Sequence, residues 1–416
     1  MNKQVNEQKK HFKLAYLISR YPAISHTFIL REIRLLRGRD LEIDVASING
    51  PDREDEKLTT QELEEKNRTY YVKRQAGKDI LPAHFKAILR GPLRYLKGLG
   101  LALSLGGADL KQIVYGGFYF AEAVLLGEWM AKKGIRHVHI HFANPAALVG
   151  LLASRIFGIT YSLTVHGPTE FFDVTKERLA EKIGGALFVV CISDFAKSQL
   201  MKVVRWEDWQ KLEVIPLGVE LDKYFPPVFR GKPETFEMLC VGRLVPAKGQ
   251  KMLIEAVNQL VFKKRKIKLR LIGDGPERKA LESEVKKRGL EESVLFEGSV
   301  GQNRIMGYFQ KADFFVLPSF AEGVPVSLME AMAMKVPCIS TNVAGIPELI
   351  ENNTNGLLVP PSNVGALVSA IEIFMDNTRF RCDVGEAGRR RIEEKYDLRK
   401  NILKNELIFR ERINKI

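Results

Sequence analysis

Long apolar runs are missing from this sequence of 416 residues. Two apolar stretches, residues 99–105 and 146–152, are both much shorter than the ~18 residues that a membrane-spanning helix needs. The N-terminal residues also lack the apolar segment of a secretory signal. We therefore expect a cytoplasmic chain.

Cysteine is scarce, and its spacing matches no metal site. The four cysteines lie far apart, without C-x-x-C or Cys/His spacing, which argues against a structural zinc site. We expect reduced thiols at these positions. They are Cys191, Cys240, Cys338 and Cys382.

The composition is that of a folded protein with an excess of positive charge. Hydrophobic residues make up 45% and charged residues 27% of the chain, which excludes a disordered or fibrous class. At roughly 100–200 residues per domain, the length predicts two or three domains. The net charge of +14 predicts attraction to an anionic partner, such as a membrane surface, a nucleic acid or a phosphorylated substrate.

Short β-rich runs alternate with helical patterns in two series, which predicts an α/β protein with two Rossmann-like domains. The first series is at residues 12–18, 43–48, 137–142, 160–166 and 186–192. The second is at residues 236–242, 269–273, 294–297, 314–317 and 337–340. We predict domains at residues 1–215 and 236–395, a Pro/Gly-rich linker at 216–235, and a C-terminal helix within 396–416 that joins the first domain.

Residues 78–105 depart from this alternation. Basic residues recur there at spacings of three or four between apolar ones, a basic amphipathic pattern. One interpretation is a pair of helices with a solvated basic face. The other is a segment that lies on an anionic membrane surface.

The loop that begins at Gly242 carries Arg243 and Lys248 between a strand and a helix. A helix N-terminus with two cations suits a diphosphate without a metal ion. An exposed loop with two solvated cations is the alternative. This alternative is less favoured because loops at Gly273 and at Glu297–Gly298 follow other strands of the same sheet. Such loops converge at one edge of the sheet.

Two carboxylates follow the strand at residues 314–317. Glu322 precedes the turn residues Gly323, Val324 and Pro325, and Glu330 lies in the following helix. Because Pro325 suits the first helical turn, we expect Glu322 to reach a ligand and Glu330 to lie deeper, where a carboxylate can hold two ribose hydroxyls.

In the first domain, His166 follows a strand and is a candidate to face the cleft between the domains. A lone histidine is more often structural. His139 and His141 share a strand face, but we discount a metal pair because no third ligand is evident nearby and the alternation fits a half-buried strand.

The loop after the first strand supplies further candidates, Ser25, His26 and Thr27. The default role of Ser25 is to cap the following helix.

Together, Gly242-Arg243…Lys248-Gly249, Gly273-Asp-Gly-Pro276, Phe296-Glu-Gly298, Glu322-x7-Glu330 and Gly345-Ile-Pro-Glu348 resemble the second domain of the group 1 (family 4) retaining glycosyltransferases. The resemblance covers residues 236–360. The N-terminal half, with Tyr21-Pro…Ser25…Thr27 and Thr164-Val-His166-Gly167, resembles the colanic-acid-type exopolysaccharide branch of that family. Many members carry a Gly-Gly pair where this chain has Ile24-Ser25-His26.

The resemblance implies a GT-B fold, with the acceptor on the first domain and the nucleotide-sugar on the second. It further implies that Arg243 and Lys248 hold the donor diphosphate, Glu330 the ribose and Glu322 the transferred sugar. Loops near Gly273 and Glu297 would approach the base, and His166 would lie beside the reacting sugar. No D-x-D motif occurs, which agrees with cations replacing a metal ion and with no cofactor.

The activity expected from this resemblance is retaining sugar transfer of the hexosyltransferase type to a lipid-linked or polysaccharide acceptor. It would take place at the inner face of the cell membrane. A GT-B epimerase or phosphorylase is the second enzyme candidate. A nucleic-acid-binding protein is the candidate from another class, but the positive charge is scattered and no nucleic-acid motif is present, so we expect no nucleic-acid partner.

Overall fold

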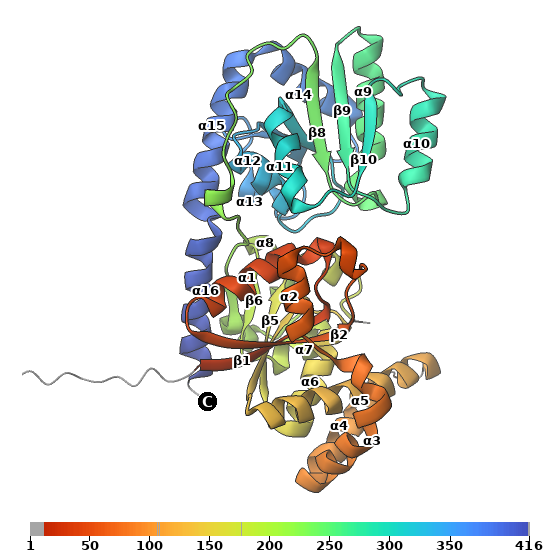
Figure 1. Cartoon of the computed structure of the whole chain (residues 1–416), viewed down its shortest axis with the longest axis vertical. Coiled ribbons are helices and arrows are strands. Elements are labelled where there is room, and N and C mark those ends of the chain that lie inside the picture. Colours follow the sequence, from red (N-terminus) through yellow and green to blue (C-terminus); the bar gives the residue numbers. More distant parts are fainter. Residues whose placement is uncertain (1–11, 106, 108, 176, 415–416) are drawn as a thin grey trace, which may run out of the picture. The chain divides into compact units, whose positions relative to one another are not determined.

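The computed structural model describes residues 12–105, 107, 109–175 and 177–414, with the side chains of Ser25, Gln302 and Asn303 left out. The chain forms two compact units (Figure 1). Unit 1 comprises Met1–Ile192, Lys197–Ile215 and Ile402–Ile416. Unit 2 comprises Ser193–Ala196 and Pro216–Asn401.

Unit 1 is built on a parallel sheet of seven strands in the order β3-β2-β1-β4-β5-β6-β7. The order reverses between β1 and β4, and ligands of open α/β sheets bind at such a reversal, outside the carboxyl ends of the strands. The strands are β1 (Phe12–Arg20), β2 (Leu41–Asn49), β3 (Tyr70–Tyr71), β4 (His137–His141), β5 (Thr160–Val165), β6 (Val189–Cys191) and β7 (Leu212–Val214).

Unit 2 repeats this plan with six parallel strands in the order β10-β9-β8-β11-β12-β13. Its order reverses between β8 and β11. The strands are β8 (Phe236–Val241), β9 (Ile267–Ile272), β10 (Val294–Gly298), β11 (Phe314–Leu317), β12 (Cys338–Thr341) and β13 (Leu357–Val359).

Helices cross between the strands in both units. Those of the first part are α1 (Thr27–Arg37), α2 (Thr60–Arg68), α3 (Val72–Arg90), α4 (Pro92–Ser104), α5 (Leu110–Lys133), α6 (Pro145–Phe157), α7 (Leu179–Gly185) and α8 (Asp194–Met201). Those that follow β8 are α9 (Gln250–Phe262), α10 (Arg278–Lys287), α11 (Gln302–Lys311), α12 (Val326–Ala333), α13 (Ile346–Leu349), α14 (Val364–Asp376), α15 (Thr378–Lys395) and α16 (Leu398–Ile413).

The α/β prediction is confirmed, and every predicted run overlaps a strand. Strands β3, β7 and β13, of two or three residues each, were not predicted, whereas the equally short β6 lies within the apolar run at residues 186–192. The prediction that β4 is half-buried is wrong, because all five of its residues are buried. Cys191, Cys240 and Cys338 are buried, and all four cysteines are free thiols.

Helices α3, α4 and α5 form a layer outside the βα alternation of unit 1 (Figure 1). The Gly91–Pro92 break divides the basic amphipathic segment into α3 and α4, and both helices pack against α5. Among the described residues, no helix is both long and apolar enough to cross a membrane.

Candidate functional site

The candidate donor site of unit 2 lies where the strand order of its sheet reverses. The carboxyl ends of the adjacent strands β8 and β11 lead into two loops, residues 242–249 and 318–325. The first loop carries Arg243 and Lys248, and the second carries Glu322. The fold therefore brings the predicted cations and one predicted acid to the same edge of the sheet.

Close backbone contact holds these loops in place. Gly249 has a φ of +67°, and a Cβ there would lie 2.2 Å from the carbonyl oxygen of Pro318. The amide of Phe320 also donates to the carbonyl of Ala247 over 2.8 Å. Gly273 approaches Gly242 in the same way, with 2.0 Å from a Cβ to the carbonyl oxygen and a φ of +136°. Only glycine fits either position without strain.

An ion pair joins the two loops within unit 2. The Lys248 ammonium donates to Oε1 of Glu322, and the hydroxyl of Ser319 donates to the same oxygen over 2.7 Å. Glu322 is only 8% exposed. Its Oε2 has no hydrogen-bond partner among the described residues. That oxygen is available to accept a hydrogen bond from a ligand hydroxyl.

Arg243 differs from Lys248 in its surroundings. Its side chain is exposed and makes no hydrogen bond or ion pair within the part of the chain that the structure describes. Its carbonyl accepts a 2.8 Å hydrogen bond from the side chain of Gln250, the first residue of α9. A fixed backbone with a free guanidinium suits an incoming anion, because such a cation needs no existing bond to be broken.

Glu330 lies on α12, 4% exposed, and accepts a 2.8 Å hydrogen bond from the Tyr224 hydroxyl. Tyr224 comes from the predicted linker, which sequence reasoning did not connect to this acid. Pro325 is the N-cap of α12, so the helix starts one residue later than expected. Gly323 and Val324 precede it in the loop, and the Gly323 carbonyl lies 2.5 Å from where a Cβ of Gly345 would be.

Glu297 is already bonded on both oxygens. Arg270 donates to Oε1 over 2.6 Å, and the Tyr308 hydroxyl donates to Oε2 over 3.0 Å. The neighbouring Gly298 has a φ of +71°, and its carbonyl accepts from the amide of Gly273 over 2.8 Å. Both oxygens of the Glu297 carboxylate are therefore engaged by side chains of unit 2.

In unit 1, His166 follows β5 and lies among aromatic rings from both sides of the strand-order reversal. Ring centroids of Phe28 and Phe142 lie 4.9 and 4.3 Å from that of His166. Phe28 is on α1, after β1, and Phe142 follows β4. Burial holds the pKa of His166 well below its ordinary value, so the ring is neutral.

The backbone around His166 is held by Glu170. This carboxylate accepts from the amides of His166 and Gly167 over 2.6 and 2.9 Å, and from the amide of Ala143 over 2.5 Å. Burial raises the pKa of Glu170, and the three amides act in the opposite direction. Sequence reasoning missed this role, although an acid four residues after the histidine is a visible signal.

The first loop of unit 1 departs from prediction in one respect. Ser25 is not the cap of α1, because it lies inside a short 3-10 helix and His26 is the N-cap residue. The side chain of Ser25 lies outside the described part. Thr27 is the first residue of α1. The His26 ring approaches Phe142, with 5.1 Å between centroids, and burial lowers its pKa.

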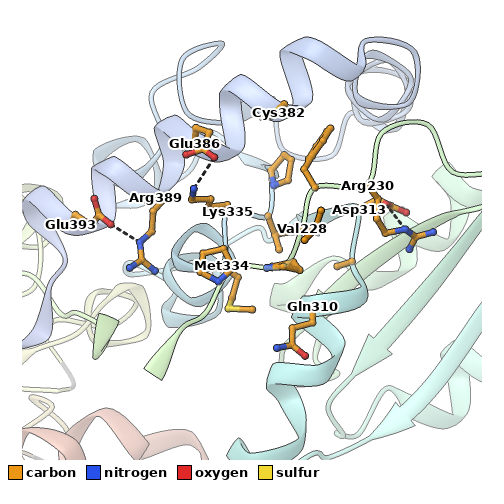
Figure 2. Close-up of a pocket in the computed structure, with 16 residues that line it drawn as sticks. Val228, Arg230, Gln310, Asp313, Met334, Lys335, Cys382, Glu386, Arg389 and Glu393 are labelled. Atoms are coloured by element: carbon orange, nitrogen blue, oxygen red, sulfur yellow. Dashed lines mark hydrogen bonds and ion pairs between the residues drawn. The ribbon is translucent and has the colours of Figure 1, made fainter. Parts of the chain in front are cut away.

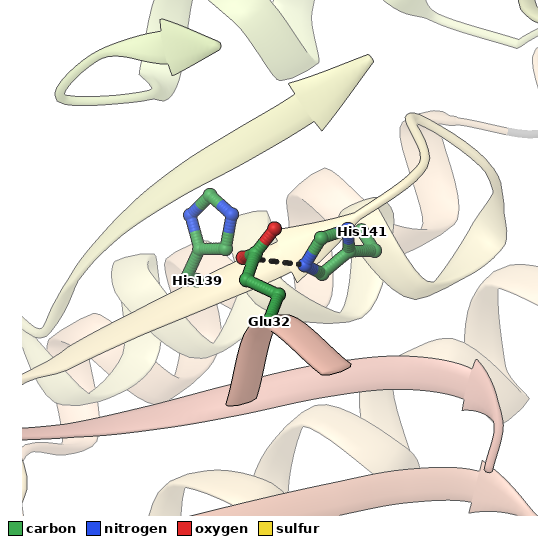
Figure 3. A group of neighbouring side chains, drawn as sticks. All are labelled: Glu32, His139 and His141. Atoms are coloured by element: carbon green, nitrogen blue, oxygen red, sulfur yellow. Dashed lines mark ion pairs between the residues drawn. The ribbon is translucent and has the colours of Figure 1, made fainter. Parts of the chain in front are cut away.

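The prediction that no third metal-ligating residue lies near His139 and His141 is wrong. Glu32, His139 and His141 offer ligand atoms within 4.8 Å of one another (Figure 3). Both ring nitrogens of His139, however, already bond to hydroxyls, those of Ser162 and Thr164, over 2.8 and 2.9 Å. The donor set would fit a divalent metal only after those bonds were broken, and we read the group as a hydrogen-bond network.

A cavity of about 410 Å³ lies elsewhere in unit 2, by the residues that precede β11 and β12 (Figure 2). Its charged side chains pair with one another, as Lys335 does with Glu386 and Arg389 with Glu393. Because ligands of such sheets bind beyond the carboxyl ends of strands, this cavity is not the donor site.

Comparison with known families gives two matches along the chain. The family model described as Glycosyltransferase Family 4 matches residues 110–223, and the one described as Glycosyl transferases group 1 matches residues 226–391.

One relative is similar over almost the whole length. WcaL of Escherichia coli K12, described as a colanic acid biosynthesis glycosyltransferase, is 25% identical over 411 residues, 95% of this chain and 98% of the relative.

Two solved structures share the fold. Sucrose-phosphate synthase of Thermosynechococcus elongatus gives a TM-score of 0.75 at 17% identity, covering 97% of this chain and 100% of that one. HepE of Anabaena, in complex with UDP and glucose, gives 0.73 at 18% identity, covering 96% and 100%.

Proposed function

This chain belongs to the group 1 glycosyltransferases of family 4, a retaining family with the GT-B fold, and we propose that it transfers a sugar from a nucleotide-sugar donor to a lipid-linked or polysaccharide acceptor. The pathway would be exopolysaccharide or cell-surface glycan biosynthesis, in keeping with the relative that is described as a colanic acid biosynthesis enzyme. The donor diphosphate binds at the loops after β8 and β11.

The pairing of a free and an anchored cation supports this proposal most. Departure of a nucleoside diphosphate concentrates negative charge on its β-phosphate. Arg243 is unpaired among the described residues, and Lys248 is held by Glu322, so both cations are available at one loop. Positive charge that is already in place stabilises the transition state more than the ground state. In this arrangement the cations take the role that a metal ion has in other transferases.

The sugar and ribose would be held by the two acids. The open Oε2 of Glu322 accepts a hydroxyl of the transferred sugar, and Glu330 holds the ribose. His166, which follows β5, is the residue that we expect to contact the reacting sugar. The acceptor hydroxyl then attacks from the face that the phosphate leaves, which retains the configuration.

The first experiment is a thermal-shift screen across UDP-, GDP- and ADP-sugars, since a donor that binds only the folded state raises its melting temperature. Product analysis with the stabilising donor, labelled in its sugar, then tests the reaction. Label in a saccharide or lipid-linked product supports transfer. Label found only in an epimerised donor, or released only with inorganic phosphate, would show an epimerase or a phosphorylase instead.

We also propose that α3, α4 and the start of α5 form a surface, called here the helical face, that binds an anionic membrane. Its exposed apolar side chains include Leu81 at 80% and Leu110 at 75% exposure. The others are Phe85, Ile88, Leu89, Leu93, Leu96, Leu103, Val114, Tyr115 and Phe118. Soluble monomers rarely expose so many apolar residues together, and exposed Lys78, Lys86, Arg94, Lys97 and Lys111 accompany them. The enzyme would be peripheral at the inner membrane face.

The membrane test uses vesicles of phosphatidylglycerol and phosphatidylcholine, with pure phosphatidylcholine for comparison. Neutralising Lys86, Arg94 and Lys97 should weaken binding to anionic vesicles, at ~1 kcal/mol per charge. Arg90 is left unchanged because it pairs with the buried carboxylate of Glu128.

The matched control removes the same charge from α10 of unit 2, at Lys279, Lys286 and Lys287. Equal binding by the two triple variants would reject the helical face.

A further inference from the structure

Three buried side chains form a chain of contacts from α1 to the end of β5 in unit 1. Oε1 of Glu32 lies 3.3 Å from Nε2 of His141, and Nδ1 of His141 lies 3.0 Å from Nε2 of His166 (Figure 3 shows the first of these contacts). Glu32, His141 and His166 are 5%, 0% and 8% exposed. Neither Glu32 nor His141 was a predicted site residue.

The contacts determine where the protons lie. The carboxylate of Glu32 faces Nε2 of His141, without the alignment of a strong hydrogen bond. A bare nitrogen lone pair would be repelled by that oxygen, so Nε2 carries the proton and Nδ1 is an acceptor. His166 must then place its own proton on Nε2 to bond with His141. The Nδ1 of His166 is left as a bare acceptor.

This acceptor has no partner among the residues that the structure describes. Nδ1 of His166 is buried and makes no hydrogen bond with the described residues. A buried polar atom without a partner costs ~1–3 kcal/mol, and such atoms in native proteins call for an explanation. A ligand that donates a hydrogen bond, such as a sugar hydroxyl, supplies the missing partner.

The surrounding structure fixes the ring that presents this atom. Phe142 adopts a φ of +71°, a conformation that costs a bulky residue ~1–3 kcal/mol, and its ring packs 4.3 Å from that of His166. Tyr16 donates to Oε1 of Glu32 over 2.8 Å and holds that carboxylate in place. The orientation of His166 thus depends on groups well behind the site.

We propose that Glu32 and His141 are positioning residues, which fix the tautomer of His166 so that its Nδ1 accepts a hydrogen bond from a hydroxyl of the bound sugar. This inference rests on the proposed function, because His166 is taken to lie beside the reacting sugar. Glu32 and His141 touch no substrate themselves. They act by ensuring that the neutral ring always offers an acceptor and never a donor at that point.

His139 provides a matched control. It lies on the same strand as His141 and is equally buried, but its two nitrogens bond to Ser162 and Thr164 and not to His166. Replacement of His139 therefore perturbs the same core without changing the chain to His166.

The test compares Glu32→Gln, His141→Ala, His141→Asn and His139→Asn in the full-length protein, each checked for its melting temperature. We expect Glu32→Gln and His141→Ala to lower kcat about 10- to 100-fold, the range of one hydrogen bond to the reacting substrate, with a donor KM changed less than about threefold. His141→Asn keeps an acceptor near Nδ1 and should recover part of the loss. His139→Asn should cost less than about threefold.

A direct readout is ¹⁵N NMR of protein labelled in histidine, with the His166 signals identified from a His166→Asn variant. Wild-type protein should show the proton of His166 on Nε2, and Glu32→Gln and His141→Ala should show it mainly on Nδ1, as a loss of kcat of about 10- to 100-fold requires. A proton on Nδ1 in the wild-type protein would overturn the inference. So would one equivalent of tightly bound zinc, or kcat losses no larger than that of His139→Asn.

The NMR measurement needs no turnover, and this separates the two proposals. If no nucleotide-sugar is a donor, the proposed function fails while the tautomer is still read directly. If transfer occurs but the tautomer does not respond to Glu32 or His141, only the present inference fails.

Discussion

The ion pair between Lys248 and Glu322 provides the sharpest test of the donor site, because it distinguishes two roles for the same carboxylate. Oε1 of Glu322 anchors the ammonium of Lys248, whereas Oε2 is open to a sugar hydroxyl. Glu322→Gln keeps the shape of the side chain and removes its charge. It therefore weakens both roles without leaving a cavity.

The expected magnitude follows from the bonds lost. A hydrogen bond to a charged group contributes ~1.5–3 kcal/mol, and about 1.4 kcal/mol corresponds to a factor of ten. We expect kcat of Glu322→Gln to fall by ~10- to 150-fold, while the donor KM changes less than about threefold. The bond to the sugar would strengthen as the diphosphate leaves, so its loss should appear mainly in kcat.

A double-mutant cycle with Lys248→Met separates the two roles. If Glu322 both anchors Lys248 and contacts the sugar, kcat of the double variant should be about tenfold lower than that of Lys248→Met. A factor of this size corresponds to the loss of one hydrogen bond. Ser319→Ala is the control, since it removes a bond to Oε1 without touching Oε2. The assay is release of nucleoside diphosphate with the cognate donor and acceptor, alongside melting temperatures.

Two results would refute this reasoning. Equal kcat values for Lys248→Met and the double variant would mean that Glu322 acts wholly through the lysine. A raised donor KM with an unchanged kcat would place Glu322 in ground-state binding instead.

Three further predictions concern other parts of the chain. Glu330→Ala should raise the donor KM about tenfold or more with a smaller change in kcat, whereas Tyr224→Phe, which removes one 2.8 Å hydrogen bond to that acid, should raise it far less in the same titration. Gly249→Ala should abolish most activity and lower the melting temperature, because its Cβ would meet a carbonyl at 2.2 Å. Gly289→Ala, with nearly the same φ but open space, should cost only ~1 kcal/mol in denaturant unfolding. Burial raises the pKa of Glu122 to about 7, so its contribution to stability is fully present below its unfolded pKa of about 4.3 and is lost as pH rises through 7. Glu122→Gln should raise the melting temperature at pH 8 by several degrees and leave it little changed at pH 4.

Much of the fold was predictable because buried parallel strands are recognisable in the sequence as short apolar runs. Each strand of four or more residues, from β1 to β12, produced a recognisable run. The loops after β8 and β11 were predictable for a related reason, since chemistry-bearing residues follow directly upon those runs. Strands β3, β7 and β13 carry too few residues for any periodicity, and they were missed; β6 is as short but lies within a longer apolar run.

The buried polar network of unit 1 could not be predicted in the same way. Glu32 lies on a helix far from His141 in sequence, and only the packing of α1 beside β4 brings the two together. The alternating histidines of β4 suggested a partly solvated face, but Ser162 and Thr164 on the adjacent strand supply their partners. That alternation of hydroxyl residues in β5 was a signal in the sequence.

The two units share one architectural plan but place different chemistry at the strand-order reversal. In unit 2 the loops there carry an exposed guanidinium and an ammonium paired with a carboxylate. In unit 1 a buried, neutral histidine follows β5, the strand next to β4, and its ring packs against Phe28 and Phe142 from the segments after β1 and β4.

The charged loops of unit 2 suit a diphosphate. The neutral ring of His166 in unit 1 suits a sugar hydroxyl, because it can accept a hydrogen bond. Donor affinity should therefore depend on ionic strength through unit 2. Discrimination between sugars that differ in one hydroxyl should depend on unit 1, because a site built to bond a hydroxyl rejects the analogue that lacks it.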